Sequence, residues 1–173
     1  MQSPYKKAIV YDLETGGLNS KTNAVTEIAM VVVDLETLQI EETFSTIIKP
    51  MLDLEEMESE STKEAKAIFK AVSVKDPETK VPSLQYRGKR LTVRDLDIVA
   101  QDIENFELLI ERKGTQYNYE QMLALESSEK YGDIAKLYFD KTYNPQALNV
   151  THMTREMLVS EGVDVMEAVE KTV

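Results

Sequence analysis

Two acidic residues near the N-terminus, Asp12 and Glu14, have the type and spacing of metal ligands. Side chains alternate along a strand, so both carboxylates would lie on the same face as Ala8 and Val10. Like charges this close repel each other unless a cation lies between them, and carboxylate oxygens are the ligands that Mg²⁺ and Mn²⁺ prefer. We predict half of a divalent-metal site at the end of a buried central strand. The alternative is a strand that ends in solvent.

The segment around these acids resembles the first motif of the DEDD-type 3′–5′ exonucleases. That family includes the proofreading subunit of bacterial replicative polymerases, ribonuclease T and oligoribonuclease. The resemblance rests on Asp-Leu-Glu-Thr-Gly-Gly-Leu at 12–18, then Thr-Glu-Ile-Ala at 26–29 and Val-Val-Val-Asp at 31–34. A second stretch, at 147–158, is similar to the family's His-Gly-Ile-Thr helix start but is one residue shorter. In that pattern His152 has a structural role before the helix cap.

The resemblance implies a metal-dependent 3′–5′ exonuclease with a ribonuclease-H-like α/β fold and two Mg²⁺ or Mn²⁺ ions. Asp12 would bridge both ions, and Glu14 would hold the ion that generates the nucleophile. The enzyme would release nucleoside monophosphates from single-stranded DNA or frayed primer ends, with RNA as the other substrate. Substrate-binding positions would be Thr15, Gly16, Gly17 and Leu18.

Two of these substrate-binding assignments have structural alternatives. The Gly16-Gly17 pair suits a turn with close substrate approach, but glycine also suits a turn alone. Leu18 resembles the residue that wedges against the terminal base, and a core leucine is the alternative.

The sequence ends at Val173, before the third and fourth acids of the family pattern. We therefore expect the N-terminal part of a proofreading-like exonuclease, inactive by itself because two ligands cannot complete the near-octahedral shells of two Mg²⁺ ions. The rival hypothesis is a non-catalytic interaction module that docks a DNA polymerase or replisome protein.

Composition narrows the class of protein. The chain has 173 residues, 42% of them hydrophobic, which indicates one domain or one domain with a large insertion. It has no 18-residue apolar run and no signal-peptide pattern, so we expect a cytoplasmic protein without a membrane span. The absence of cysteine and the single histidine exclude thiolate and multi-histidine zinc sites.

The net charge of −11 argues against a protein that coats nucleic acid, but basic residues cluster between 75 and 94. The cluster is either a solvated loop or a nucleic-acid contact surface. The candidate contact residues are Lys80, Arg87, Lys89, Arg90 and Arg94.

Residues 1–50 predict a three-stranded antiparallel start, with strands at 7–12, 25–34 and 38–48. The four residues Asp-Leu-Glu-Thr occur twice, at 12–15 and 34–37, and we interpret the second copy as a hairpin turn between two strands.

Residues 51–144 predict a mainly helical insertion, with helices at 59–71, 93–112 and 118–140. Thr92 would cap the second helix and Gly114 would end it. The basic stretch 76–90 predicts a loop or loose hairpin.

Residues 145–173 would return to the exonuclease domain, incomplete at its C-terminus. Thr154 would cap a short helix that ends at Gly162, and Asp164 would begin another.

The family fold also predicts an exposed sheet edge. Its first strand is central, so truncation would leave Ile9 to Leu13 with unpaired backbone groups and a bare apolar face. Such an edge would either pair with a second copy or be covered by the insertion helices.

Overall fold

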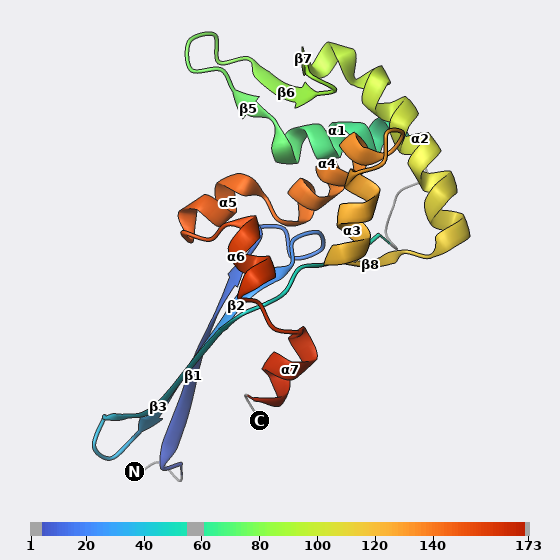
Figure 1. The fold of residues 1–173 in the computed structure, drawn as a ribbon. Helices are drawn as coiled ribbons and strands as arrows, with labels where there is room; N and C mark the ends of the chain where they lie inside the picture. The colour runs from blue at the N-terminus through green and yellow to red at the C-terminus, as the bar shows by residue number, and fades with distance from the viewer. Residues whose placement is uncertain (1–4, 55–60, 172–173) are drawn as a thin grey trace.

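The computed structural model describes residues 5–54 and 61–171, apart from the side chains of residues 111 and 112. It is a mixed α/β structure in which a long, twisted sheet extends as an arm from a mainly helical body (Figure 1). The strands are β1 (Lys7–Thr15), β2 (Val25–Asp34), β3 (Ile40–Ile47), β4 (Met51–Asp53), β5 (Val74–Lys75), β6 (Pro82–Tyr86), β7 (Lys89–Leu91) and β8 (Gln116–Asn118). The helices are α1 (Ser61–Val72), the 3₁₀ turn η1 (Val93–Asp95), α2 (Leu96–Lys113), α3 (Tyr119–Glu126), α4 (Gly132–Thr142), α5 (Pro145–Val150), α6 (Arg155–Ser160) and α7 (Val165–Glu170).

The arm is the predicted three-stranded antiparallel sheet, in the order β1-β2-β3. The predicted bounds of β2 are confirmed, and β3 is a little shorter than predicted. The first strand continues past its predicted end at residue 12, because its pairing with β2 extends through Asp12 opposite Ala29 and Glu14 opposite Glu27. Both acids therefore lie within the ladder.

The sheet is not buried as the sequence suggested. β1 is an outer strand, and Ile9, Val10 and Tyr11 are 61%, 57% and 71% exposed. The prediction of a buried central strand is therefore wrong for the described residues, whereas the exposed edge and bare apolar face expected over Ile9 to Leu13 are found. The alternative in which the insertion helices cover this edge is also wrong, since apolar side chains on both faces of β1 remain exposed.

The turn at 34–37 is confirmed and has a defined geometry. The Asp34 carboxylate accepts hydrogen bonds from the backbone N–H of Glu36 and Thr37, at 2.9 and 2.7 Å. The backbone N–H of Leu38 donates to the Asp34 carbonyl, and Leu38 adopts a left-handed φ of 58°.

The same turn recurs between β5 and β6, in the sequence Asp-Pro-Glu-Thr at 76–79. The Asp76 carboxylate accepts from the N–H of Glu78 and Thr79, and Lys80 has the same φ of 58°. The predicted loose hairpin over 76–90 is thus an ordered three-stranded sheet, β5-β6-β7.

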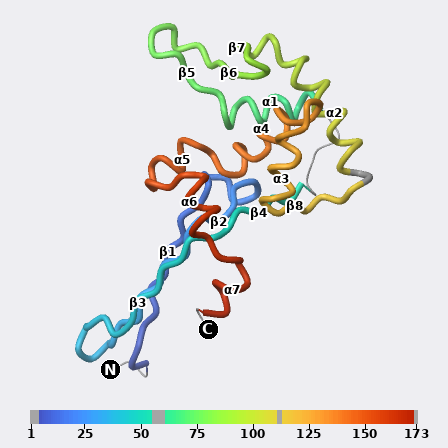
Figure 2. Tube along the Cα trace, viewed as in Figure 1, coloured from blue at the N-terminus to red at the C-terminus, as the bar shows by residue number. Residues whose placement is uncertain are grey.

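The core lies in the helical body, where α1, α2 and α4 pack together (Figure 2). The predicted stripe along α2 is buried and includes Val99, Ile103 and Phe106, each 0% exposed. Thr92 and Asp95 form the predicted cap, and Gly114 ends α2 with a φ of 97°. The predicted helix 59–71 corresponds to α1, which begins at Ser61. The first two residues of the prediction lie outside the described residues.

The predicted helix 118–140 is wrong as a single element, because it divides into α3 and α4. The chain turns between them, and the Gly132 N–H donates to the Ser128 carbonyl. A Cβ on Gly132 would lie 2.3 Å from the Glu126 carbonyl oxygen, so the tight turn requires glycine. Three short elements were not predicted, namely the β4–β8 pair and α5.

The two short C-terminal helices begin as predicted. The Thr154 hydroxyl accepts from the Met157 N–H at the start of α6, and the Asp164 carboxylate accepts from the Met166 N–H at the start of α7. Within the described residues, no helix has the length and apolar character needed to span a bilayer.

Candidate functional site

Asp12 and Glu14 lie on one face of β1, as the alternation predicted. Asp12 is exposed, and its carboxylate accepts a 3.0 Å hydrogen bond from the N–H of the next residue, Leu13. Glu14 is half-buried and stands directly opposite Glu27 of β2. This face of the sheet therefore carries three carboxylates within two paired strands.

The third carboxylate does not complete a metal site with the other two. The Glu27 carboxylate accepts a hydrogen bond from the Ser45 hydroxyl of β3. Among the residues that the structure describes, no three histidine, cysteine, aspartate or glutamate side chains gather closely enough to hold an ion. Asp12 and Glu14 supply the hard oxygen donors that suit Mg²⁺ or Mn²⁺, but as a pair, so most of the coordination shell would be water.

The Gly16-Gly17 loop packs against the end of α4. The Gly16 carbonyl accepts from the Asn144 N–H at 2.7 Å, and the Asn23 amide bonds the carbonyls of Lys141 and Thr142 at 2.8 and 3.2 Å. A Cβ on Gly16 would lie 2.4 Å from the Thr142 carbonyl oxygen. Glycine is therefore required here by contact within the protein, which is a reason that sequence reasoning missed.

Thr15 and Leu18 flank this loop, and they differ in whether the side chain is available to a ligand. The Thr15 hydroxyl donates to the Gly17 carbonyl at 2.7 Å, so it is engaged in the loop itself. The Leu18 side chain is fully exposed. The alternative that Leu18 is a core residue is therefore wrong, and its side chain is free to contact a ligand.

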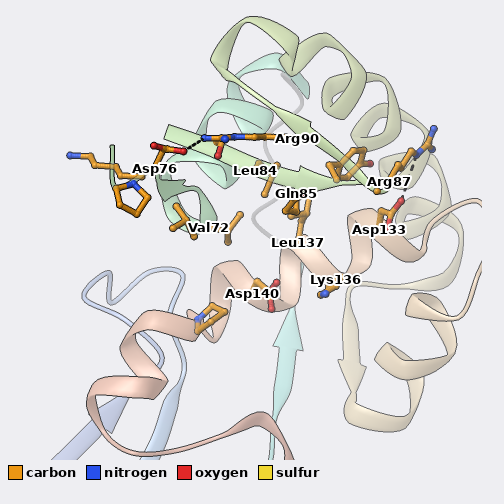
Figure 3. Close-up of a pocket in the computed structure, with 17 residues that line it drawn as sticks. Val72, Asp76, Leu84, Gln85, Arg87, Arg90, Asp133, Lys136, Leu137 and Asp140 are labelled. Carbon is orange, nitrogen blue, oxygen red and sulfur yellow. Dashed lines mark hydrogen bonds and ion pairs between the residues drawn. The ribbon is translucent and has the colours of Figure 1, made fainter. Parts of the chain in front are cut away.

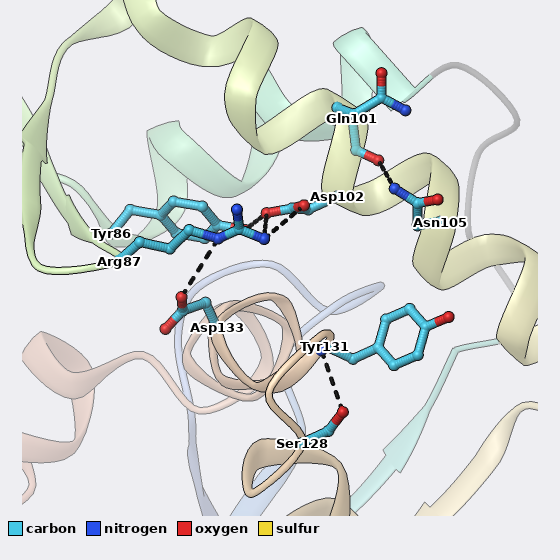
Figure 4. A network of polar contacts seen from close by, with 8 residues as sticks. All are labelled: Tyr86, Arg87, Gln101, Asp102, Asn105, Ser128, Tyr131 and Asp133. Atoms are coloured by element: carbon cyan, nitrogen blue, oxygen red, sulfur yellow. Dashed lines mark hydrogen bonds and ion pairs between the residues drawn. The ribbon is translucent and has the colours of Figure 1, made fainter.

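Two of the predicted basic contacts are neutralised by neighbouring acids. Arg87 lies between Asp102 of α2 and Asp133 of α4, with nitrogen-to-oxygen distances of 2.8 and 3.7 Å (Figure 4). Arg90 pairs with Asp76 at 2.9 Å. The pKa of Asp76 is lowered to about 2 by the hydrogen bond from the Thr79 N–H and by Arg90.

The other three basic candidates, Lys80, Lys89 and Arg94, are all exposed. Lys80 occupies the left-handed position of the second turn, and Arg94 lies in η1. The structure therefore divides the predicted basic cluster. Arg87 and Arg90 form ion pairs with neighbouring acids, whereas Lys80, Lys89 and Arg94 extend into solvent.

A cavity of about 580 Å³ lies between the β5-β6-β7 sheet and α4, and sequence reasoning did not identify it (Figure 3). Arg87 and Arg90 line it on one side, and Lys136 and Asp140 line it from α4. Burial raises the pKa of Asp140 to about 6. In the sequence, the spacing that places Lys136 and Asp140 on one helix face was the only sign of this cavity.

His152 lies beside a smaller cavity of about 400 Å³, with Glu27, Ser45 and Glu161. It has a left-handed φ of 56° and precedes the Thr154 cap of α6. This is the position expected of it from the second motif.

Comparison with known proteins gives one family match. Residues 9–81, somewhat less than half of the chain, match the model of a family described as RNase_T, an exonuclease. No curated protein and no solved structure gives a significant match. The matched stretch contains Asp12, Glu14 and all of the arm except the first two residues of β1, and it continues beyond residue 51, where the insertion was expected to begin.

Proposed function

We propose, from the match of residues 9–81 to an exonuclease family, that this chain is part of a metal-dependent 3′–5′ exonuclease. The match supports a nuclease-type function. The observation that carries the finer proposal is the placement of Asp12 and Glu14 on one face of β1, beside the exposed Leu18 loop. Paired carboxylates next to a free apolar side chain suit a site that binds a cation and a terminal nucleotide.

Asp12 and Glu14 would hold Mg²⁺ or Mn²⁺, which when bound would supply positive charge to the scissile phosphate. The chain's own residues would do the rest. Leu18 would pack against the terminal base. The Gly16 loop is fixed to the end of α4 through Asn23 and to the start of α5 through Asn144, and would hold Leu18 at a set distance from the acids. Lys80, Lys89 and Arg94 would attract the phosphate backbone, since their charges are exposed.

We further propose that residues 1–173 alone bind metal weakly and are inactive as a nuclease. The described part of the chain brings together two acidic ligands, and water must supply the remaining positions. The preferred substrate is the 3′ end of single-stranded DNA, with RNA as the second choice. DNA replication and proofreading are the proposed setting.

The test uses two glutamates from the two Asp-Leu-Glu-Thr segments. Glu14→Gln should weaken Mn²⁺ binding at least roughly tenfold, because it removes one of two charged ligands. Glu36→Gln changes the same residue type in the hairpin turn and should leave binding unchanged. Electron paramagnetic resonance of free Mn²⁺ measures both. Equal binding by the two variants would overturn the assignment of the metal ligands.

Activity is tested separately with 5′-labelled single-stranded DNA and RNA in Mn²⁺. We expect no digestion by the unmodified chain, by Glu14→Gln or by Glu36→Gln. Digestion from the 5′ end would refute the proposed direction. Stepwise shortening from the 3′ end that Glu14→Gln abolishes and Glu36→Gln spares would refute the proposed inactivity while supporting the exonuclease assignment.

A non-catalytic docking module is the second candidate. It is favoured by the two-carboxylate site, which is too small to complete a metal centre among the described residues. The absence of Mn²⁺ binding would support it, and a DNA polymerase or another replisome protein would be the partner to test first.

A further inference from the structure

Within the part of the chain that the structure describes, the outer edge of β1 presents a row of unpaired backbone groups, whose direction follows from the pairing of β1 with β2. The Leu35 N–H donates to the Lys6 carbonyl, so the even-numbered residues of this stretch face β2. Backbone groups alternate along an antiparallel strand. The N–H and C=O groups of Lys7, Ile9, Tyr11 and Leu13 therefore point to the open edge.

One of these outward groups already has a partner. The Leu13 N–H donates to the Asp12 carboxylate at 3.0 Å. The donors that remain are those of Lys7, Ile9 and Tyr11, centred on Ile9. The Ile9 and Tyr11 side chains beside them are 61% and 71% exposed. An edge that is apolar, extended and supplied with free donors is a template for another strand.

We infer that β1 pairs with β1 of a second copy of this chain, antiparallel and centred on Ile9, to make one continuous sheet. This inference is independent of the proposed nuclease function. The interface would be two-fold symmetric, so that each contact between a residue of one copy and a residue of the other occurs twice.

The register follows from three requirements. A two-fold axis perpendicular to the sheet keeps each side chain on its own face, so residues of equal parity must lie opposite each other. Outward-facing groups must pair with outward-facing groups, and the occupied Leu13 N–H must not be needed. Centring on Ile9 meets all three conditions, because Ile9 then bonds Ile9 and Lys7 bonds Tyr11 of the second copy.

Charge complementarity favours the same register. With Ile9 at the centre, Lys6 of one copy lies opposite Asp12 of the other, twice in the dimer. A shift to a centre at Tyr11 would place Asp12 opposite Val10 and would pair Ile9 with Leu13, whose N–H is already used. A centre at Val10 also requires the Leu13 N–H, opposite Lys7. Opposite charges across a strand pair stabilise the pairing, whereas a charge opposite valine does not.

The first test compares two edges of the same sheet. Ile9→Pro removes the central outward donor without removing a hydrogen bond to β2. Thr43→Pro is the matched control, because Thr43 is exposed on β3 and its N–H points away from β2 on the opposite edge. Light scattering of the full chain should give a dimer for the unmodified chain and for Thr43→Pro, but a monomer for Ile9→Pro. A monomeric unmodified chain at high concentration would overturn the inference.

The second test reads the register and does not depend on a proline. The chain contains no cysteine, so Ile9→Cys introduces a single thiol. Opposite residues in a hydrogen-bonded pair are about 5.5 Å apart at Cα, within reach of a disulfide. Mild oxidation should cross-link Ile9→Cys and leave Tyr11→Cys uncross-linked. Efficient cross-linking of Tyr11→Cys alone would overturn the proposed register.

Charge exchange gives a third readout. Lys6→Asp and Asp12→Lys should each shift the dimer towards monomer, and the double variant should restore it. If another protein covered this edge in place of a second copy, the double variant would not restore the association. Failure to restore the dimer would contradict the Lys6–Asp12 pairing.

Discussion

The same short sequence pattern has two conformations in this chain. Asp-Leu-Glu-Thr at 12–15 is extended in β1, whereas Asp-Leu-Glu-Thr at 34–37 and Asp-Pro-Glu-Thr at 76–79 form the same hydrogen-bonded turn. At 12–15 the opposing residues of β2 continue the ladder, so extension is supported by pairing. At the two turns the flanking strands pair with each other, and the intervening aspartate satisfies the free amides.

This difference decides which carboxylates are available to a ligand. Asp34 accepts backbone hydrogen bonds from Glu36 and Thr37, so its oxygens serve the turn. Asp12 accepts one hydrogen bond, from Leu13, and Glu14 lies beside it on the same face. The residue after each motif separates the cases further, since Gly16 is buried and Leu38 is exposed.

The largest effect is expected at Gly16. Gly16→Ala would place a Cβ 2.4 Å from the Thr142 carbonyl oxygen and 2.9 Å from the Tyr143 Cα, both backbone atoms that cannot move aside. We expect a loss of about 3 kcal/mol in the free energy of unfolding, measured by urea denaturation. Gly88→Ala is the control, because it has a positive φ of 68° but nothing within 4 Å of an added Cβ, and it should cost roughly 1 kcal/mol. Equal losses would show that contact with α4 is unimportant.

A smaller effect of opposite sign is expected at Leu38, the matched position after the second motif. Its left-handed φ of 58° strains a leucine, and the side chain is 76% exposed, so little burial would be lost. Leu38→Gly should stabilise the protein by about 0.5–1 kcal/mol.

Lys80→Gly tests the same idea in the second turn, where φ is also 58°. Thermal denaturation should show a higher midpoint for both variants. Destabilisation by either variant would contradict the equivalence of the two turns.

A weaker effect with a defined pH dependence is expected at Asp34. Hydrogen bonds from Thr37, chiefly its backbone N–H, lower the pKa of the Asp34 carboxyl. A lowered pKa means that the stabilising contribution is present above the ordinary aspartate pKa of about 4 and is lost as the pH falls through the folded-state pKa. The stability difference between the unmodified chain and Asp34→Ala should therefore shrink below pH 4. A difference that grows with acid would refute this assignment.

Much of the arm could be predicted from the sequence because its signals are local. The β-branched run at 25–34 and the turn at 34–37 define the hairpin, and both are confirmed. The exposed edge of β1 was predicted from the family fold and not from local signals, because apolar residues alone do not show whether another layer covers them. The split between α3 and α4 was missed because the close contact of Gly132 with the Glu126 carbonyl oxygen forms only where the chain turns between the two helices.

The candidate site, like the arm, could be predicted from the sequence only where its signals are local. Alternation places Asp12 and Glu14 on one face, and the structure agrees. The requirement for glycine at position 16 could not be predicted, since Gly16 lies against Thr142 at the end of α4, more than a hundred residues away in the chain. The ion pairs of Arg87 with Asp102 and Asp133 likewise join three elements, so residue composition over 75–94 could not reveal them.

The smallest effect on stability is expected at Asp12 itself. Asp12→Asn retains an oxygen that can accept the Leu13 N–H, and the side chain is exposed, so the free energy of unfolding should change by less than about 0.5 kcal/mol. The same substitution removes a charge from the proposed metal pair and should weaken Mn²⁺ binding, whereas Asp34→Asn in the turn should not. Paired measurements of urea unfolding and Mn²⁺ resonance on both variants separate the two roles. A strongly destabilised Asp12→Asn with unchanged Mn²⁺ binding would show that the first motif, like the other two, is a structural device, and that the carboxylates of β1 serve the strand rather than a ligand.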